Sequence, residues 1–265
     1  MSSQSAETYL VRPVGRVVSS VREGDEMPID GVPASIEVYP EYEAGLAGIE
    51  SNTHLLILGW FHKANRESLT LSRHGGRGRG VFGLRSPGRP NPVGLTAARV
   101  LGVEGRVVRL GRLDMMDGTP VVDIKRYSPG WDSIFSARTA RDTEHPGNRN
   151  RTAFLRDMLA EAVNFHGERC VGVALGARMV DHAIHHWGIA KKEPALRVGW
   201  GPDGCVNDAL QAITGATSGN GRLDAKGSPD YLLSWEGRSL RFTPREGLGV
   251  EEALNAVLGE VLGVG

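Results

Sequence analysis

The stretch from residue 82 to residue 127 places the tightest constraint on the fold of this chain. It reads FGLRSPGRPNPVGLTAARVLGVEGRVVRLGRLDMMDGTPVVDIKRY. A loop rich in Arg, Pro, Gly and Asn comes first (85–92), two strand-like runs follow, and a second tight turn occupies residues 117–120. Rigid loops that carry charged and amide groups between apolar strands are more often binding sites than mere connections. The stretch therefore predicts a β-structured unit that binds a ligand through its loops.

Much of the first half of the chain has the pattern of short strands. The segments rich in β-branched residues, separated by Gly, Pro and Glu-Gly, are 10–19, 34–39, 53–60, 94–103 and 105–113. We expect Glu104-Gly105 to form the hairpin turn between the last two. Many short strands with few helices indicate a barrel or a sandwich, here as a domain over residues 1–132.

The second half has a different pattern. Residues 133–150 are polar, charged and without periodicity, which predicts a linker. Residues 151–265 then form an α/β domain. Its expected helices are 152–163, 173–187, 205–213 and 250–262, and its expected strands are 195–200, 231–235 and 239–243, the last two joined by a turn at Glu236-Gly237.

Composition limits the class of protein. Hydrophobic residues make up 40% of the chain, and no apolar run approaches the ~20 residues of a transmembrane helix. The N-terminus lacks the pattern of a secretory signal, and the two cysteines fit a reducing compartment, so we expect a cytoplasmic protein without a membrane partner.

Charge is balanced overall but uneven along the chain. The formal net charge is +0, which is unusual for a protein that binds RNA mainly through phosphates. Between Ser68 and Val103, however, there is no Asp or Glu, and the arginines in that span are Arg73, Arg77, Arg79, Arg85, Arg89 and Arg99. The pattern predicts a local positive surface; the alternative is a solvated Gly/Arg loop.

The two turns, RSPGRPNPVGLT and LDMMDGTPVVDIKRY, resemble the motifs of the TrmO (TsaA-like) family, RSP-x-RPNPIGLS and LD-x-x-DGTP-x-x-DIKPY. The resemblance covers about residues 9–132. It implies a β-barrel that uses S-adenosylmethionine to methylate N6 of threonylcarbamoyl-adenosine beside the tRNA anticodon. Because related proteins work as dimers, it also implies a homodimer.

The resemblance further implies which residues bind the cofactor. They are His62, Lys63, Arg85, Leu95, Met116, Asp117, Gly118 and Thr119, with Pro28 at the family's early Gln-Pro contact, where Met27 replaces the Gln. By residue type, Arg85 and Arg89 are suited to clamp a carboxylate or phosphate. Asn91, next to Pro90 in the same loop, offers a donor and an acceptor to an adenine edge or ribose. Asp117 is suited to accept from a ribose hydroxyl or an amino group.

Methyl transfer to an amide-like nitrogen benefits from removal of its proton during the transfer. By residue type, the candidate bases are Asp117, His62 and Tyr127. The sequence does not choose among them, and positioning of the reactants without a base is the alternative.

The second half resembles FmdE, the accessory protein associated with formylmethanofuran dehydrogenase. The matching phrases are FHGERCVGVALGARM and CVNDALQAITGATSGNGRL, beside the usual FHGHLCPGLALG and C-x-x-DAIQ-x-x-TGCTLGN. Glu168 stands where that family often has a second His, and Ala216 where it often has a Cys. The fold class expected for the whole chain is therefore α+β, an all-β TrmO-like barrel followed by a smaller α/β FmdE-like domain.

Three residues of the second half suit a metal. His166 and Cys170 are four apart and share a face if helical, and Cys205 is a third soft ligand, a set that fits Zn²⁺ or another transition metal. The alternative is that both cysteines are small buried apolar residues. His182 and His186 form another pair at a spacing of four, which we expect on a solvated helix face.

These patterns support three functional hypotheses. The leading one is an S-adenosylmethionine-dependent methyltransferase acting beside the tRNA anticodon loop, with the Arg-rich loop 73–89 contacting the RNA. The second keeps the methyl transfer but assigns it a small-molecule or metal-bound acceptor presented by the FmdE-like domain. The third is a sensor that binds the cofactor or a metal without catalysis.

Overall fold

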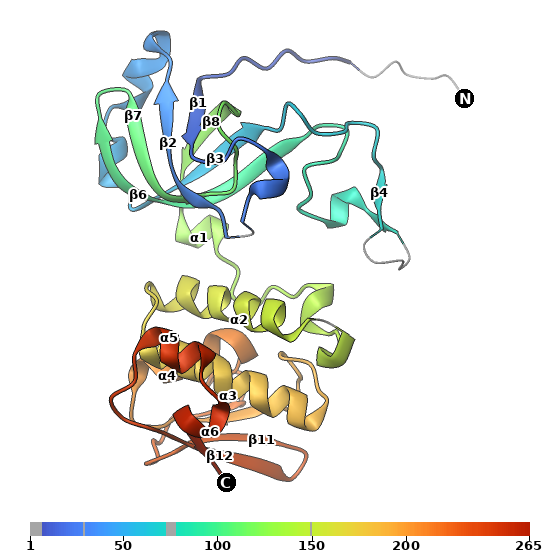
Figure 1. The fold of residues 1–265 in the computed structure, drawn as a ribbon, viewed down its shortest axis with the longest axis vertical. Helices are drawn as coiled ribbons and strands as arrows, with labels where there is room; N and C mark the ends of the chain where they lie inside the picture. Colours follow the sequence, from blue (N-terminus) through green and yellow to red (C-terminus); the bar gives the residue numbers. More distant parts are fainter. Residues whose placement is uncertain (1–6, 29, 73–77, 149) are drawn as a thin grey trace. The chain divides into compact units, whose positions relative to one another are not determined.

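The computed structural model describes residues 7–28, 30–72, 78–148 and 150–265. Arg73 and Arg77 of the basic loop lie outside the described residues. The chain divides into two compact units, Met1–Ser133 and Ile134–Gly265, whose elements Figure 1 shows. In the part of the chain that the structure describes, no helix is long and apolar enough to cross a membrane.

The first unit is built on an antiparallel barrel. Within the described residues six strands close in the order β1-β2-β7-β6-β3-β8 (Figure 1). Their bounds are β1 Gly15–Ser19, β2 Val32–Val38, β3 His54–Trp60, β6 Val93–Glu104, β7 Val107–Leu113 and β8 Pro120–Arg126. Alternate side chains point inward and form the core, for example Val17, Ile36, Ile57, Val108 and Leu110.

Shorter elements fill the connections of this unit. They are the 3-10 helices η1 Gly24–Glu26, η2 Pro40–Leu46, η3 Ile49–Ser51 and η4 Val81–Gly83, the paired strands β4 Thr70–Leu71 and β5 Arg79–Gly80, and the helix α1 Pro129–Asp132. The hairpin between these strands is confirmed, but its two loop residues are Gly105 and Arg106, one position later than expected, because Glu104 still pairs with Val107. Gly105 takes φ +54 there.

Two strand predictions in this unit need correction. The strand is shorter than the expected 10–19 and spans only Gly15–Ser19, since Pro13 lacks the N–H that a ladder continuing past Val14 needs. β8, which closes the barrel between β1 and β3, was not predicted from the sequence. Val121 is buried and the last two residues are exposed, and Asp123 and Lys125 conceal the alternation that marks a strand.

The second unit has three layers. The sheet runs in the order β10-β9-β11-β12-β13, with β9 Arg197–Gly199, β10 Leu223–Asp224, β11 Tyr231–Trp235, β12 Arg238–Pro244 and β13 Leu262–Val264. The helices α3 Val171–Trp187 and α4 Gly204–Thr214 cover one face of it, and α2 Arg151–His166 packs on those two helices (Figure 1). The α+β fold class, with a barrel followed by a mixed domain, is confirmed.

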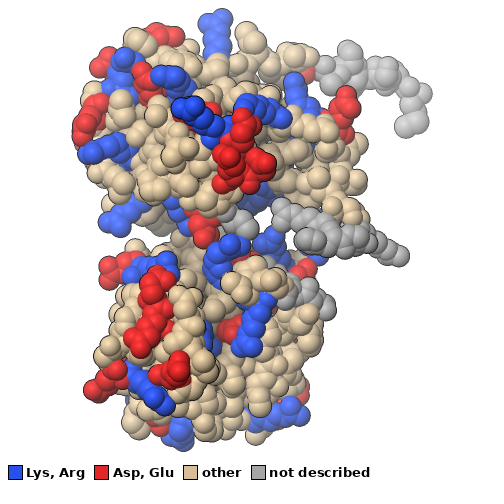
Figure 2. Space-filling model, viewed as in Figure 1, with Lys and Arg blue, Asp and Glu red and all other residues tan. Residues whose placement is uncertain are grey.

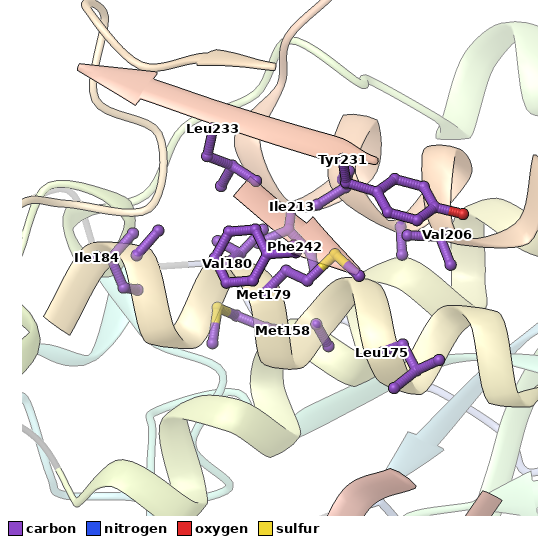
Figure 3. Packing of buried hydrophobic residues seen from close by; sticks show 14 of the residues in the cluster. Met158, Leu175, Met179, Val180, Ile184, Val206, Ile213, Tyr231, Leu233 and Phe242 are labelled. Atoms are coloured by element: carbon purple, nitrogen blue, oxygen red, sulfur yellow. The ribbon is translucent and has the colours of Figure 1, made fainter. Parts of the chain in front are cut away.

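The core of the second unit lies between its helices and its sheet. Figure 3 shows Met179 and Ile184 of α3 packed with Leu233 of β11 and Phe242 of β12. Almost every residue of α3 is buried, because α2, α4 and the sheet surround it. The turn at Glu236-Gly237 between β11 and β12 is confirmed, with φ 47 and φ 79.

Two glycines let α3 and α4 pack at close range. A Cβ on Gly172 would lie 2.6 Å from the Cβ of Cys205, and a Cβ on Gly176 would lie 2.6 Å from the Cβ of Ala209. Both distances are shorter than any real contact between carbon atoms, so a larger residue at either position must push the helices apart. The spacing of four residues on each helix also shows that the two helices run parallel here.

The expected terminal helix 250–262 is wrong as a single element. The structure has α5 Val250–Asn255, α6 Leu258–Val261 and then the strand β13. Arg178, buried in α3, donates hydrogen bonds to the carbonyls of Ala253, Leu254 and Ala256. These carbonyls lie at the C-terminal end of α5, where a helix that stops leaves its last carbonyls without intrahelical partners. Pairing of the final residues with β12 then fixes an extended end.

Residues 133–150, for which the sequence predicts a linker, supply one partner of a buried ion pair, Asp142. The segment includes η5 Ala140–Asp142 and η6 Pro146–Asn148. Lys191 reaches the carboxylate of Asp142 at 2.9 Å and also pairs with Glu161 of α2. The side chains of Lys191 and Asp142 are only 8% and 7% exposed.

The solvated face expected for His182 and His186 is wrong for His182. Its ring is partly buried, stacks on His186 with centroids 5.8 Å apart and meets the ring of Phe242 edge-on at 5.9 Å. Burial, followed by the neighbouring His186, lowers the pKa of His182. The pattern was misleading because β12 covers a helix face that carries histidines.

Candidate functional site

The topology of the barrel collects the predicted cofactor residues at one rim. Neighbouring strands are antiparallel, so β1, β3 and β7 end where β2, β6 and β8 begin. We call this end, marked by Ser19, Trp60, Leu113, Val93 and Pro120, the motif rim. The candidate residues that lie on it or on loops leaving it are Pro28, His62, Lys63, Arg85, Arg89, Pro90, Asn91, Leu95, Met116, Asp117, Gly118 and Thr119.

The turn 116–119 is fixed against the end of β1. The backbone N–H of Asp117 donates to the carbonyl of Val21 at 2.7 Å, and the N–H of Gly118 donates to Val17 at 2.9 Å. One carboxylate oxygen of Asp117 accepts from the N–H of Ser19 at 3.1 Å. Gly118 takes φ +73, which other residues rarely adopt. The Asp117 side chain is therefore held at the rim, half-buried, with its second oxygen available to a ligand.

Arg89 was expected to bind a carboxylate or phosphate of the ligand, but in the structure its guanidinium binds backbone carbonyls of its own loop. Its Nε–H donates to the carbonyl of Ser86 at 2.9 Å. Its Nη2 donates to the carbonyls of Val81, at 3.0 Å, and Leu84. The guanidinium thus holds the loop 81–89 in shape, and Arg89 supports the site through the loop.

Arg85 is the exposed arginine of the same loop, and the structure brings it to β6. Its Nη2 donates to the carbonyl of Leu95. Both residues are among those that the family resemblance assigns to the cofactor site. Leu95 itself keeps 43% of its surface exposed. A guanidinium next to an exposed apolar side chain is suited to bind a ligand that has both a carboxylate and an apolar part.

Two buried hydroxyls at the motif rim lack partners. Neither Oγ of Ser86 nor Oγ1 of Thr119 has a hydrogen-bond partner among the described residues. Buried polar atoms are nearly always paired, so a bound water or ligand is the usual explanation for such an orphan. Each lies in one of the two sequence motifs, and both fit a ligand as rich in hydroxyl and amine groups as S-adenosylmethionine.

The remaining rim candidates lie on short, tied loops. The N–H of His62 donates to the carbonyl of Trp60 at 2.8 Å, which leaves its exposed ring at the end of β3. Lys63 forms an exposed ion pair with Glu23 at 3.2 Å. The carbonyl of Pro28 accepts from the N–H of Gly31 at 2.9 Å.

The loop that carries Pro90 and Asn91 packs near the end of β3 as well. The carbonyl of Pro90 accepts from Nε of Arg66 at 3.1 Å, and the guanidinium of Arg66 lies 5.5 Å from the ring centroid of Trp60. Asn91 is exposed, and its carbonyl accepts from the N–H of Val93 at 2.8 Å. The amide of Asn91 is thus presented on a loop that packs on the end of β3.

Tyr127 is not brought to this rim. It follows β8, whose first residue lies next to the turn 116–119, so it emerges at the opposite rim, roughly 25 Å away at the rise of an extended strand. There its N–H donates to the carbonyl of His54 at 3.2 Å. Of the three candidate bases, Asp117 and His62 lie on the motif rim, and Tyr127 lies at the opposite rim.

The second unit does bring its three candidate metal ligands together. His166 is the last residue of α2, Cys170 caps the start of α3, and Cys205 lies in the first turn of α4. Their ligand atoms all lie within 4.8 Å of one another, and all three residues are partly buried. One imidazole nitrogen and two sulfurs are a donor set for Zn²⁺ or another thiophilic metal.

Several contacts hold Cys205 in place. The buried amide of Asn207 accepts from the N–H of Gly201 at 3.1 Å and donates to its carbonyl at 3.0 Å. The hydroxyl of Tyr231 accepts from the N–H of Asp203 at 2.8 Å, and Asp203 in turn caps Cys205. Burial, followed by a hydrogen bond with Cys170, raises the pKa of the Cys205 thiol to about 11. The free thiol therefore stays protonated at neutral pH, and a bound metal would have to displace the proton.

Asp208 is part of this cluster and was not singled out in the sequence. Its Oδ2 lies 2.9 Å from Nδ1 of His166. The signal that could have found it is its position three residues after Cys205, which places both on one face of α4.

Comparison with known proteins agrees with this division of the chain. Residues 17–133 match the family described as tRNA-methyltransferase O N-terminal domain, and residues 165–252 match the family described as FmdE, Molybdenum formylmethanofuran dehydrogenase operon.

Three related proteins illustrate the match. A probable S-adenosyl-L-methionine-binding protein of Archaeoglobus fulgidus is 38% identical over 226 residues, or 80% of this chain and 60% of its own length. An S-adenosyl-L-methionine-binding protein of the same organism is 38% identical over 130 residues, or 47% of this chain and 94% of its own. A tRNA (adenine(37)-N6)-methyltransferase of Mus musculus is 43% identical over 100 residues, which cover 36% of this chain and 23% of that protein.

The relative that is matched over 94% of its length shares the whole barrel unit with this chain. The chain therefore belongs to the TrmO family of S-adenosylmethionine-dependent methyltransferases, and it carries an FmdE domain after the TrmO domain.

Proposed function

We propose that this protein transfers a methyl group from S-adenosylmethionine to N6 of threonylcarbamoyl-adenosine beside the tRNA anticodon. The observation that carries the proposal is the motif rim, where one end of the barrel presents Arg85, Asp117 and two unpartnered hydroxyls together. The relative from Mus musculus, a tRNA (adenine(37)-N6)-methyltransferase, supports tRNA as the acceptor. The proposal includes a cytoplasmic location, which the sparse cysteines favour, and a homodimer, which the resemblance to the TrmO family implies.

The residues of the rim have distinct tasks in this proposal. S-adenosylmethionine supplies a methyl group on a positively charged sulfur, and transfer to nitrogen requires donor and acceptor in line. Arg85 binds the carboxylate of the methionine part, and the hydroxyls of Ser86 and Thr119 pair with its polar edges. Asp117, fixed through Ser19, accepts the proton that leaves N6.

A patch of positive charge on the barrel supports an RNA acceptor. His54, at the start of β3 and therefore toward the opposite rim, pairs in register with Arg99 of β6. Arg112 lies on the neighbouring β7, next to Leu113 of the motif rim. Burial, followed by the positive charges of Arg99 and Arg112, lowers the pKa of His54. Within the described residues, neither arginine has an ion-pair partner, so the patch is free to contact phosphates. Figure 2 shows both signs of charge interspersed on the visible face, so the RNA contact is local.

The test is a methyl-transfer assay with labelled S-adenosylmethionine. Bulk tRNA that carries threonylcarbamoyl-adenosine is offered beside tRNA that lacks this modification. We expect label only in the modified tRNA. Label in neither, with cofactor binding confirmed by calorimetry, would reject the tRNA acceptor and favour a small-molecule or metal-bound acceptor. Cofactor binding without transfer to any acceptor would favour a sensor.

Variants separate the cofactor site from the RNA surface. Arg85→Ala should weaken cofactor binding by about ten- to hundredfold, because a charge-assisted hydrogen bond contributes roughly 1.5–3 kcal/mol. Arg99→Gln with Arg112→Gln should leave cofactor binding unchanged. For tRNA binding, the double variant should reduce the steepness of the plot of log binding constant against log salt concentration by between about 1 and 2. The matched control is Arg16→Gln with Arg109→Gln, which removes the same charge from two arginines that have acidic partners. Equal slopes for the two double variants would remove the patch from the RNA surface.

We further propose that the second unit binds Zn²⁺ or another thiophilic transition metal through His166, Cys170 and Cys205. The observation that favours it is the convergence of these three donors from three different helices. Cys205→Ala should release metal from the purified protein, measured by elemental analysis. Unchanged metal content would contradict the assignment.

A further inference from the structure

Asp208 contacts one of the two ring nitrogens of His166. The imidazole Nδ1 lies 2.9 Å from Oδ2 of Asp208, whereas Nε2 lies 3.6 Å from Sγ of Cys170. The ring therefore directs one nitrogen to a carboxylate and the other to a thiol. Because a carboxylate only accepts, Nδ1 is the nitrogen that donates to Asp208, and Nε2 is the nitrogen that faces the thiol.

The surroundings hold this orientation. The His166 side chain is 15% exposed, so the ring has little room to turn. Asp208 lies on α4, one turn after Cys205, so the same helix supplies a sulfur donor and the partner of the histidine. Metal-binding histidines commonly donate their second ring N–H to a carboxylate, which fixes the ring and strengthens the ligand.

The number of donors also has a consequence. Among the described residues, no fourth His, Cys, Asp or Glu has a ligand atom within 4.8 Å of all three donors, those of His166, Cys170 and Cys205. Structural zinc sites are closed by four protein ligands, whereas sites with three keep a position for water or an external ligand.

We propose that Asp208 is a positioning residue that makes His166 a ligand through Nε2, and that the centre keeps one exchangeable position for a small external donor. This inference rests on the metal-binding function proposed above. It goes further because it assigns a role to a residue outside the donor set and distinguishes an open centre from a closed structural one.

The experiment uses the full-length protein loaded with Co²⁺, whose absorption reports its ligands. The wild type should show a thiolate-to-cobalt charge-transfer band and intense visible bands of a four-coordinate ion. Asp208→Asn keeps the size of the side chain and removes its charge, and it should keep the charge-transfer band while binding Co²⁺ and Zn²⁺ about ten- to hundredfold more weakly. The matched control is Asp224→Asn on β10, outside the cluster, which should bind like the wild type.

Imidazole then tests the exchangeable position. Added to the Co²⁺-loaded wild type, it should shift the visible bands with saturation and leave the charge-transfer band in place. Visible bands that do not respond would show a closed centre and overturn that part of the proposal.

The outcomes separate the two levels of the argument. If the wild type and Cys205→Ser both lack the charge-transfer band, the metal-binding function fails and this inference fails with it. If the wild type binds metal and Asp208→Asn binds as tightly as the Asp224→Asn control, only the role of Asp208 is overturned. Circular dichroism of each variant confirms that a loss of affinity does not come from unfolding.

Discussion

The barrel unit holds its candidate residues on loops, whereas the second unit holds its donors at the ends of three helices. On the motif rim, backbone carbonyls of the loop 81–89 are fixed by one guanidinium, that of Arg89. In the second unit, His166, Cys170 and Cys205 meet only because α3 and α4 pack at close range through Gly172. A loop site depends on local bonds, and a helix-end site depends on the packing of the whole unit. Mutations far from the chemistry should therefore affect the second site more than the first.

The strongest test of this comparison is Arg178→Met. It leaves the carbonyls of Ala253, Leu254 and Ala256 without their donor, and unsatisfied buried groups should destabilise the second unit by about 2–4 kcal/mol. Hydrogen exchange followed by mass spectrometry can assign the loss to residues 134–265 while the barrel stays protected. Arg245→Met, at an exposed position, is the control. Equal loss of protection in the barrel would show that the units do not unfold separately.

A smaller effect is expected from Gly172→Ala. The new methyl group would lie 2.6 Å from the Cβ of Cys205, so the helices must separate at a cost of about 1–3 kcal/mol. Zn²⁺ affinity, measured by competition with a chelator, should fall, and cofactor binding at the barrel should not change. Gly204→Ala places a methyl group where no atom lies within 4 Å and should be close to neutral. Retained affinity in Gly172→Ala would show that the cluster tolerates helix movement.

On the barrel side, Arg89→Ala tests whether loop order supports the motif rim. Without the guanidinium the loop 81–89 loses three carbonyl contacts and must be ordered by the ligand, so cofactor affinity should fall by about tenfold. Calorimetry with S-adenosylmethionine measures the loss, and Arg89→Lys should not restore affinity because a lysine lacks the planar fork. An unchanged affinity would mean that the rim is shaped without this loop.

The smallest expected effect is a pH dependence confined to the second unit. Burial alone would raise the pKa of Asp142, but hydrogen bonds from Lys191 and Thr139 outweigh it and lower that pKa from its ordinary value. A depressed carboxyl pKa contributes stability above its unfolded value, and this contribution is lost as the pH falls through the folded value. Wild type should therefore lose on the order of 1 kcal/mol or less between about pH 5 and pH 3 relative to Asp142→Asn. Thermal unfolding of both proteins at both pH values measures this loss. If the stability of wild type and of Asp142→Asn falls equally between the two pH values, the stabilising role of the Asp142–Lys191 pair is contradicted.

The same contrast explains what the sequence could predict. Arg85, Asp117 and Gly118 belong to local motifs, so their grouping at one rim needed only the barrel and its antiparallel order. Tyr127 also belongs to a motif, but one strand carries it to the opposite rim. Spacing along the chain says nothing about which end of a strand a residue occupies until the register is known.

In the second unit the residue types were predictable and their partners were not. The convergence of His166, Cys170 and Cys205 was expected, whereas Asp208 was missed, because its contact joins residues of two helices 42 positions apart. The terminal helix was wrong for a related reason, since Arg178 lies more than 70 positions before the carbonyls that it binds. Such side-chain-to-backbone bonds between distant segments leave no periodic signal.

The antiparallel order of the barrel has a further consequence for engineering. β8 begins at the motif rim and ends at the opposite one, so the chain leaves the barrel on the side away from every candidate cofactor loop. The C-terminal end of the barrel can therefore be lengthened, shortened or joined to another module without rebuilding a loop of the rim. A fluorescent reporter fused after Ser133 would be attached at that exit, which makes the barrel a starting point for a sensor of S-adenosylmethionine.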